Sequence, residues 1–379
     1  MIKTKTVVLL CIAVFLSKFA VYDITSASFI ACGTIISDVV VDPQNPEIVY
    51  AISVRDSVFK SIDAGGAWNA VGEEGFFNKP SYSLAVDPEN TQIIYAGQYK
   101  SIDSGKTWKL ISDGQDMTAA ISKLTVHPRD TEILYSLTSN KGAYKSTNGG
   151  VFWTAIGDEK LGDIRALALD PNDPNILYGY FMREDEYGPG RTTFYDSFGP
   201  WEYGMKGEIF KSVDSGVTWT SSLLSVTGIA GLAVDPGNSA IIYAGTRPPN
   251  PASRFAIRNM NTGQGIYRSI DGGKQWDFIK FDLPEESAVS VFAFDPKNLR
   301  IVYAGTTQGV FISTDYGENW RSINNGFPKN ISVRTLAINP RNPDVIYAGT
   351  LRDGIYKTID GGKTWNQANN GIPALPSCP

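Results

Sequence analysis

The chain has 379 residues, 42% of them hydrophobic, which is enough apolar material for a large buried core. A disordered or fibrous protein is therefore not expected. The 34 Lys and Arg residues against 39 Asp and Glu residues give a formal net charge of −5. This balance provides no basic surface for nucleic acid or for an anionic membrane.

Residues 1–28 have the order of parts that is typical of a secretory signal peptide. Lys3 and Lys5 precede the apolar run VVLLCIAVFL at 7–16, and the small residues TSAS follow at 25–28. This run is too short to cross a bilayer, which needs roughly 20 apolar residues, and no later segment approaches that length. We therefore predict a signal peptide at 1–28, one mature domain at 29–379, and a secreted or periplasmic location. An ordinary N-terminal core strand is the alternative.

From residue 35 onward the chain repeats one unit seven times. Each unit has an apolar run, a turn of the type Asp-Pro-x-Asn, a run that ends near Tyr-Ala-Gly, a third run, and a box of the type Ser-x-Asp-x-Gly-x-x-Trp. The β-branched and aromatic runs predict strands, with Pro, Asp and Asn in the turns between them. This pattern gives four antiparallel strands per unit. The boxes lie at 61–68, 101–108, 146–153, 212–219, 269–276, 313–320 and 358–365.

Four strands in each of seven units predict an all-β fold, a single seven-bladed β-propeller. Closing a ring of sheets removes the exposed sheet edges at which chains aggregate. A linear solenoid would need polar capping repeats at its two ends, and the end units of this chain resemble the others. We therefore expect a closed ring.

Two cysteines remain after removal of the signal peptide, Cys32 and Cys378, at opposite ends of the mature chain. In an oxidising compartment such a pair predicts a disulfide. The segment from Trp320 to Asn339 gives the length of an ordinary link between a box and the next turn. The segment from Cys32 to the first turn and the segment from the last box to Cys378 overlap when they are placed along a link of this length. The two cysteines should therefore be neighbours. A lipid anchor at Cys32, with FIAC at 29–32 as a degenerate lipobox, is the alternative.

The repeated box resembles the Asp-box, or bacterial neuraminidase (BNR) repeat, of the sialidase-like superfamily, and the resemblance covers residues 35–370. In families that carry it, the box forms the turn between the third and fourth strands of a blade. At that place the boxes point outward and cannot converge on a substrate or a metal ion. We expect a structural role for the box residues Asp63, Asp103, Asn148, Asp214, Asp271, Asp315 and Asp360. His127 replaces the acid of a turn, and we expect a turn role for it as well.

Departures from the repeat indicate where function lies, because long inserts on a rigid scaffold often carry binding or catalysis. The fourth unit has an insert at 181–207 and the fifth has one at 247–265, both between the second and third strands. The first insert combines aromatic and charged side chains, which suit a sugar or peptide partner. Its candidate ligand-binding residues are Arg183, Arg191, Trp201 and Tyr203. A loop that packs only on itself is the alternative.

The start of the first strand in each unit should lie at the same face, near the axis of the ring. Lys123, Arg165 and Arg334 stand there, four or five residues before the turn. We predict that they line the mouth of the channel and hold an anion. Simple solvation of the channel is the alternative.

Xyloglucan-cleaving glycoside hydrolases resemble this chain in both repeated motifs, but they use two propellers and this chain supplies one. Exported photosystem II assembly factors with one seven-bladed ring resemble it better and act as non-catalytic scaffolds. Sialidases, which carry an Arg-Ile-Pro motif absent here, and ten-bladed sortilin-type receptors resemble it less.

We therefore predict an exported, non-catalytic propeller that binds an extracytoplasmic protein or a polysaccharide through the face with the inserts. A glycoside hydrolase of the xyloglucanase type is the alternative. No metal or other cofactor is expected, since the sequence has no Cys/His cluster.

Overall fold

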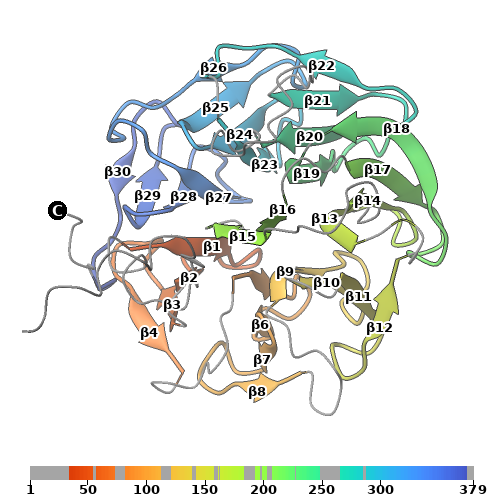
Figure 1. Cartoon of the computed structure of the whole chain (residues 1–379). Helices are drawn as coiled ribbons and strands as arrows, with labels where there is room; N and C mark the ends of the chain where they lie inside the picture. Colours follow the sequence, from red (N-terminus) through yellow and green to blue (C-terminus); the bar gives the residue numbers. More distant parts are fainter. Residues whose placement is uncertain are drawn as a thin grey trace, which may run out of the picture.

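Seven four-stranded antiparallel sheets surround a central axis in the computed structural model (Figure 1). The predicted seven-bladed β-propeller is confirmed. The structure describes residues 34–53, 57–72, 82–111, 121–138, 142–157, 161, 163–182, 193–196, 199–202, 207–226, 228–247, 265–284 and 287–373. The predicted signal peptide at 1–28 lies outside these residues.

Each blade is built from the four strands of one repeat unit. The innermost strands are β1 (Ile36–Val41), β5 (Leu84–Val86), β9 (Ile121–Val126), β13 (Asp163–Leu169), β19 (Ile229–Val234), β23 (Val289–Phe294) and β27 (Val333–Ile338). The second strands are β2 (Val49–Ser53), β6 (Ile94–Ala96), β10 (Leu134–Thr138), β14 (Leu177–Met182), β20 (Ile242–Thr246), β24 (Val302–Thr306) and β28 (Ile346–Thr350).

The outer half of each blade carries the box. The third strands are β3 (Ser57–Ser61), β7 (Tyr99–Ser101), β11 (Ala143–Ser146), β17 (Gly207–Ser212), β21 (Ile266–Ser269), β25 (Gly309–Ser313) and β29 (Ile355–Thr358). The outermost strands are β4 (Asn69–Val71), β8 (Lys109–Leu110), β12 (Thr154–Ile156), β18 (Thr220–Val226), β22 (Asp277–Ile279), β26 (Arg321–Ser322) and β30 (Asn366–Gln367). A further hairpin, β15 (Thr193–Asp196) and β16 (Gly199–Glu202), belongs to no blade.

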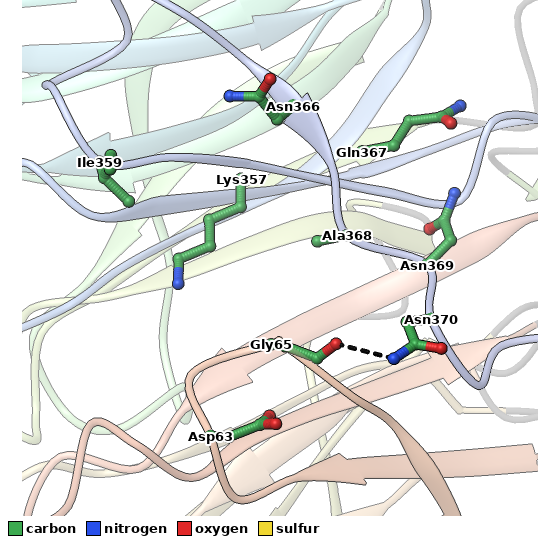
Figure 2. A pocket seen from close by; sticks show the side chains of 10 residues that line it. Asp63, Gly65, Lys357, Ile359, Asn366, Gln367, Ala368, Asn369 and Asn370 are labelled. Atoms are coloured by element: carbon green, nitrogen blue, oxygen red, sulfur yellow. Dashed lines mark hydrogen bonds between the residues drawn. The ribbon is translucent and has the colours of Figure 1, made fainter.

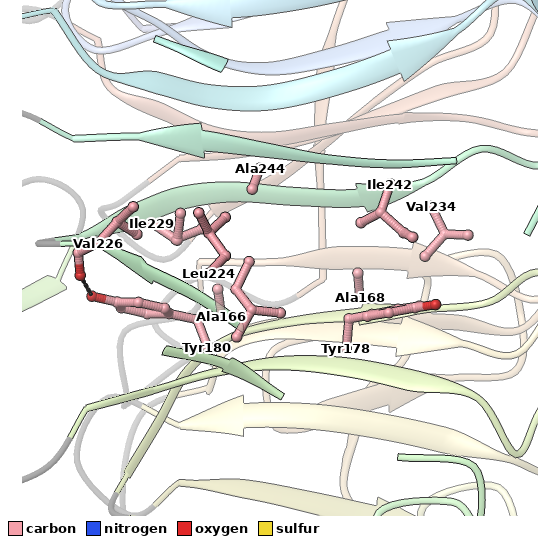
Figure 3. Packing of buried hydrophobic residues seen from close by; sticks show 11 residues of the cluster. Ala166, Ala168, Tyr178, Tyr180, Leu224, Val226, Ile229, Val234, Ile242 and Ala244 are labelled. Atoms are coloured by element: carbon pink, nitrogen blue, oxygen red, sulfur yellow. Dashed lines mark hydrogen bonds between the residues drawn. The ribbon is translucent and has the colours of Figure 1, made fainter. Parts of the chain in front are cut away.

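The hydrophobic core lies between neighbouring blades. Figure 3 shows one such layer, in which Tyr178 and Tyr180 of blade four pack against Ile242 and Ala244 of blade five. The second strands are buried except at the last residues of β2 and β14, because both of their faces meet another blade. Six of the outermost strands have two or three residues and are largely exposed, whereas β18 has seven and alternates between exposed and buried residues.

Each box is a turn closed by its own side chains. In the second box, Asp103 Oδ1 accepts hydrogen bonds from the Ser101 hydroxyl at 2.7 Å and from the Thr107 N–H at 2.8 Å. Gly105 has a φ of +90°, which few residues with a side chain tolerate, and its N–H donates to Ser101 Oγ. In the third box Asn148 Oδ1 accepts the two equivalent bonds, at 3.0 and 2.8 Å, so an amide can replace the carboxylate.

The boxes also join each blade to the one before it. Tyr347 and Lys357 of blade seven both donate to the backbone oxygen of Ala64 in the box of blade one, each at 2.7 Å. The Lys357 ammonium lies over the Tyr347 ring, 5.6 Å from its centroid. Equivalent donor pairs at other seams are Tyr95 with Lys100, Tyr178 with Lys211, and Tyr243 with Arg268. We call this arrangement the seam latch.

The ring closes without a sheet shared by the two ends of the chain. Trp68 Nε1 of blade one donates to Ala368 O of blade seven at 2.8 Å, and the Thr34 N–H donates to Arg352 O at 2.8 Å. Thr34 Oγ1 donates to Pro373 O at 3.0 Å, so the first and last described residues lie side by side. Closure therefore depends on the latch and on these terminal contacts.

Replacing Tyr347 by Phe removes one donor of the closing seam latch and keeps the ring. A typical intramolecular hydrogen bond contributes about 1 kcal/mol, so we expect the free energy of unfolding to fall by about that amount. Urea unfolding measures it, with Tyr243→Phe as the matched change at an internal seam. Unchanged stability in both variants would show that the latch contributes nothing.

The predicted Cys32–Cys378 bridge lies outside the described residues, although the contact of Thr34 with Pro373 brings its flanking chain together. We expect the mature protein to have a mass two hydrogen atoms below that of its reduced form. In the chain-entropy model Cys378→Ser should lower the free energy of unfolding by up to about 4–5 kcal/mol. A lipid-sized mass increase on Cys32 would contradict the bridge and support anchoring.

Candidate functional site

The two faces of the ring carry different kinds of loops. Each box donates a backbone hydrogen bond to the turn of its own blade, as from Ala64 N to Glu47 O at 2.8 Å, so boxes and turns share one face. We call it the box face. The inserts leave the ends of β14 and β20 on the opposite face, which we call the insert face.

The hairpin of the blade-four insert forms a two-stranded sheet of its own. Its register pairs Phe194 with Trp201 and Thr193 with Glu202. In the view along the ring axis, the hairpin lies across the middle of the ring rather than within a blade (Figure 1). Of the four predicted insert residues, Trp201 is placed in β16 by its backbone, whereas Arg183, Arg191 and Tyr203 lie outside the described residues.

A β-bulge interrupts six innermost strands at one equivalent position. The ladder between the first and second strands skips one residue in β1, β9, β13, β19, β23 and β27. The skipped residues are Ser37, Ser122, Arg165, Ala230, Ser290 and Arg334. Bulges often re-aim side chains near functional sites. In two of them, the Ser37 and Ser122 hydroxyls donate to the carbonyls of Ile52 and Leu137 in the neighbouring strand.

Asp38 is a buried carboxylate one residue beyond the first bulge, and it joins three blades. Its Oδ1 accepts a hydrogen bond from the Thr335 hydroxyl of blade seven at 2.8 Å. Its Oδ2 accepts bonds from the Ser83 hydroxyl at 3.2 Å and the Leu84 N–H at 3.0 Å, both in blade two. Lys123 Nζ of blade three lies 3.9 Å from the same oxygen, and the Lys123 side chain is 56% exposed. Asp38 thus holds the inner strands around the ring closure.

The predicted channel residues reach the insert face on three different blades. Lys123 follows the bulge of blade three, whereas Arg165 and Arg334 occupy the bulges of blades four and seven. Arg165 Nη2 donates to Asp163 Oδ2 at 3.2 Å. Lys123 and Arg165 therefore each have a carboxylate neighbour, and an anion would have to compete with it. Anion binding at this mouth stays a prediction.

His127 takes the place of the turn aspartate and accepts the same two hydrogen bonds. Its Nδ1 accepts hydrogen bonds from the N–H groups of Arg129 and Asp130, both at 3.2 Å. Asp42 accepts the equivalent pair from Gln44 and Asn45. Burial lowers the pKa of His127, which keeps the imidazole neutral and its Nδ1 available as an acceptor.

Nothing in the described part of the chain gathers three or more His, Cys, Asp or Glu residues into a metal-binding group. Asp235, whose pKa is raised by burial, lies in a turn of the box face, where its Oδ1 accepts hydrogen bonds from Gly237 and Asn238. It is therefore not placed to protonate a substrate on the insert face. The described residues include no helix with the length and apolarity that crossing a bilayer requires.

The comparisons with known proteins agree with the repeated box. A family model described as sortilin, neurotensin receptor 3 (Sortilin-Vps10), matches residues 264–375, the outer half of blade five and blades six and seven. All seven blades carry the box at the same turn. The chain is a seven-bladed propeller whose boxes resemble the BNR repeat.

The proteins to which this propeller is similar in sequence or fold include xyloglucanases and YCF48. A xyloglucanase of Hypocrea jecorina is 34% identical over 137 residues, which are 32% of this chain and 13% of that protein. The GH74 xyloglucanase from Xanthomonas campestris has a TM-score of 0.56 at 16% identity, covering 90% of this chain and 62% of its own. A structure of YCF48 bound to D1 peptide has a TM-score of 0.57 at 12% identity, covering 86% of this chain and 94% of its own.

The chain spans 13% of the curated xyloglucanase and 62% of the Xanthomonas campestris enzyme, whereas it covers nearly all of YCF48. At identities of 12% and 16%, the solved structures establish the fold alone.

The lowered pKa values of the box acids predict that the stability of the fold depends on pH. The Thr107 hydroxyl and then the Thr107 N–H, bonded to Asp103, lower the pKa of that carboxyl to about 2, and Asp360 has the same value through Thr364 and Thr358. A carboxyl group whose pKa is lower in the folded state stabilises the fold above its unfolded pKa, about 3.9 for Asp. That contribution disappears as the pH falls through the folded pKa.

We therefore expect the urea midpoint of the propeller to fall between about pH 4 and pH 2, with a smaller fall in Asp103→Asn. Asn148 indicates that the amide keeps the turn, so the variant should fold at neutral pH. An identical pH profile for both proteins would contradict a contribution from Asp103.

Proposed function

We propose that the propeller is an exported, non-catalytic binding protein whose insert face holds an extracytoplasmic protein or a polysaccharide. Export rests on the signal-peptide pattern of residues 1–28, which predicts a secreted or periplasmic location. The insert-face assignment is carried by the hairpin β15–β16.

The hairpin β15–β16 is a candidate binding surface because it belongs to no blade. Within the part of the chain that the structure describes, its two strands pair only with each other, and an isolated two-stranded hairpin is marginally stable in water. Phe194 and Trp201 are directly opposite in the backbone register of the hairpin. Aromatic side chains with charged neighbours are the groups that most often anchor peptides and stack against sugars.

The inner strands add polar groups to the same face. Lys123 is exposed beside the buried Asp38, and Arg165 lies next to Asp163. A partner that lies across the middle of the ring would meet the hairpin and these groups together.

The hydrogen bonds and ion pairs that the acids of the inner strands already make favour binding over hydrolysis. A glycoside hydrolase needs two carboxyl groups across the scissile bond, one of them with a raised pKa. Among the described acids at the start of the inner strands, Asp38 is filled by four hydrogen-bond donors and Asp163 pairs with Arg165. Asp38 is therefore not available as a base or nucleophile, and Asp163 is already engaged by Arg165.

A glycoside hydrolase of the xyloglucanase type is the second candidate. It is favoured by the 34% identity with the Hypocrea jecorina xyloglucanase over 137 residues. The carboxylates for such a reaction would have to come from the inserts, which contain Glu184, Asp185 and Glu186.

Deleting residues 184–203 should abolish partner binding and leave the blades folded, because the insert joins two strands that already pair with each other. Binding is measured by affinity electrophoresis in a polysaccharide panel and by cross-linking to purified extracytoplasmic proteins. The matched control is Phe152→Ser, which removes an exposed aromatic side chain from the box face. Normal binding by the deletion variant would overturn the insert-face assignment.

The two candidates are separated by reducing-sugar release from xyloglucan and other β-glucans, with a sialoside as control. The proposal expects no release from any substrate. Release that disappears in Glu184→Gln or Glu186→Gln would make the propeller an enzyme and refute the non-catalytic assignment.

A further inference from the structure

The hollow where the ring closes belongs to the seam between blades seven and one. It has a volume of about 320 Å³ and lies on the box face. Figure 2 shows Lys357 pointing toward the box that carries Asp63. The amides of Asn366 and Gln367 point away from that box. The polar side chains around this hollow therefore do not face one common space, and the hollow joins two blades without forming a site for a ligand.

The hairpin β15–β16 of the blade-four insert has a register that fixes which of its backbone groups point outward. Asp196 and Gly199 are register partners, and only two residues separate them along the chain. A connection this short requires them to be a hydrogen-bonded pair. Hydrogen-bonded and non-hydrogen-bonded pairs alternate along an antiparallel ladder. The non-hydrogen-bonded pairs are therefore Tyr195 with Pro200 and Thr193 with Glu202.

The two edges of the hairpin differ because one of them carries a proline. Residues of a non-hydrogen-bonded pair direct both the backbone N–H and the C=O away from the partner strand. On β16 this places Pro200 at the outer edge, where it has no N–H to offer. Proline in a sheet is confined to such outward positions, and it closes the edge to a further strand. The outer edge of β16 is therefore closed.

The outer edge of β15 keeps all of its backbone groups. Thr193 and Tyr195 each have an N–H and a C=O that β16 does not use. They are two residues apart, so these groups repeat about every 7 Å, which is the repeat of an extended chain. In the described part of the chain, β15 pairs with β16 and with no other strand. A third strand on this edge would stabilise a hairpin that is marginal alone.

We infer that the outer edge of β15 binds an extended segment of a partner protein, which adds a third strand to the hairpin. Carbonyl groups of the segment accept from the N–H groups of Thr193 and Tyr195, and its own N–H groups donate to their oxygens. Addition of a strand to an open edge is a common way of recognising a peptide. A polysaccharide has hydroxyl groups but no repeating amide, so this edge favours a polypeptide.

This inference rests on the proposed function, because it uses the same insert, and it narrows the partner from a protein or a polysaccharide to a polypeptide. It also assigns the contact to the backbone of one strand. Both refinements can fail while the insert face remains the binding face, so the two assignments have separate tests.

The decisive variant is Tyr195→Pro, which copies the closed state of the other edge onto β15. Tyr195 is the register partner of Pro200, and its N–H is not used within the hairpin, so proline removes only an outward donor. The change also removes the tyrosine ring. The matched control is therefore Tyr195→Ala, which loses the ring and keeps the N–H. A second control, Glu202→Pro, adds a proline to the edge that is already closed.

The probe is a phage-displayed library of random linear peptides of twelve residues, selected on the mature protein. The tightest peptide is synthesised and titrated against each variant by fluorescence anisotropy. Loss of the Tyr195 N–H leaves one peptide carbonyl unpaired, so Tyr195→Pro should bind roughly tenfold or more weakly than Tyr195→Ala. Glu202→Pro should bind as the wild type does, and deletion of 184–203 should abolish binding.

Hydrogen exchange gives a readout that does not depend on the side chains. The amides of Thr193 and Tyr195 should exchange more slowly when the peptide is added to the wild type, because the added strand accepts their hydrogen bonds. Unchanged exchange at both amides in the peptide complex would contradict the edge contact.

Three further results would overturn the inference and leave the insert face as the binding face. The first is equal peptide binding by Tyr195→Pro and Tyr195→Ala. The second is a polysaccharide that needs residues 184–203 for binding, when the library yields no peptide. The third is a dimer of the mature protein that Tyr195→Pro dissociates, which would assign the edge to a second copy of the chain. Peptide binding that survives the deletion would refute both assignments.

Discussion

The seam latch is the contact on which the ring depends. A tyrosine from the second strand and a lysine or arginine from the third both donate to a backbone oxygen in the next blade's box. That oxygen is held in place because the box is itself closed by its acid, its serine or threonine, and its glycine. The same short motif therefore fixes a turn within one blade and an acceptor for the preceding blade.

This dual use explains why the ring closes without an exchanged strand. All seven sheets are made from single repeat units, so the seam between blades seven and one has no backbone ladder beyond the Thr34–Asp353 bridge. Its latch through Ala64 is as short as those at internal seams, and Asp38 adds a buried contact to Thr335 nearer the axis. The closing seam is thus built like the others and is reinforced from the inside.

The repeat made the architecture predictable from the sequence, because strand number, turn residues and box spacing all recur in one register. The sequence also placed Arg165 and Arg334 at the starts of inner strands, but that these positions are bulges depends on pairing with the second strand. The Lys357 donor was hidden, since its acceptor lies nearly three hundred residues away in the chain.

The bulges have a consequence for how such rings diversify. A bulged residue stands outside the hydrogen-bond ladder, so its side chain can change without altering the pairing of the sheet. In this chain the equivalent position is serine in three blades, arginine in two and alanine in one, on the same backbone. The bulged residues of the innermost strands can therefore vary independently, while the paired strands around them keep the same backbone. New recognition properties can arise there one residue at a time, while the latched blades keep their stability.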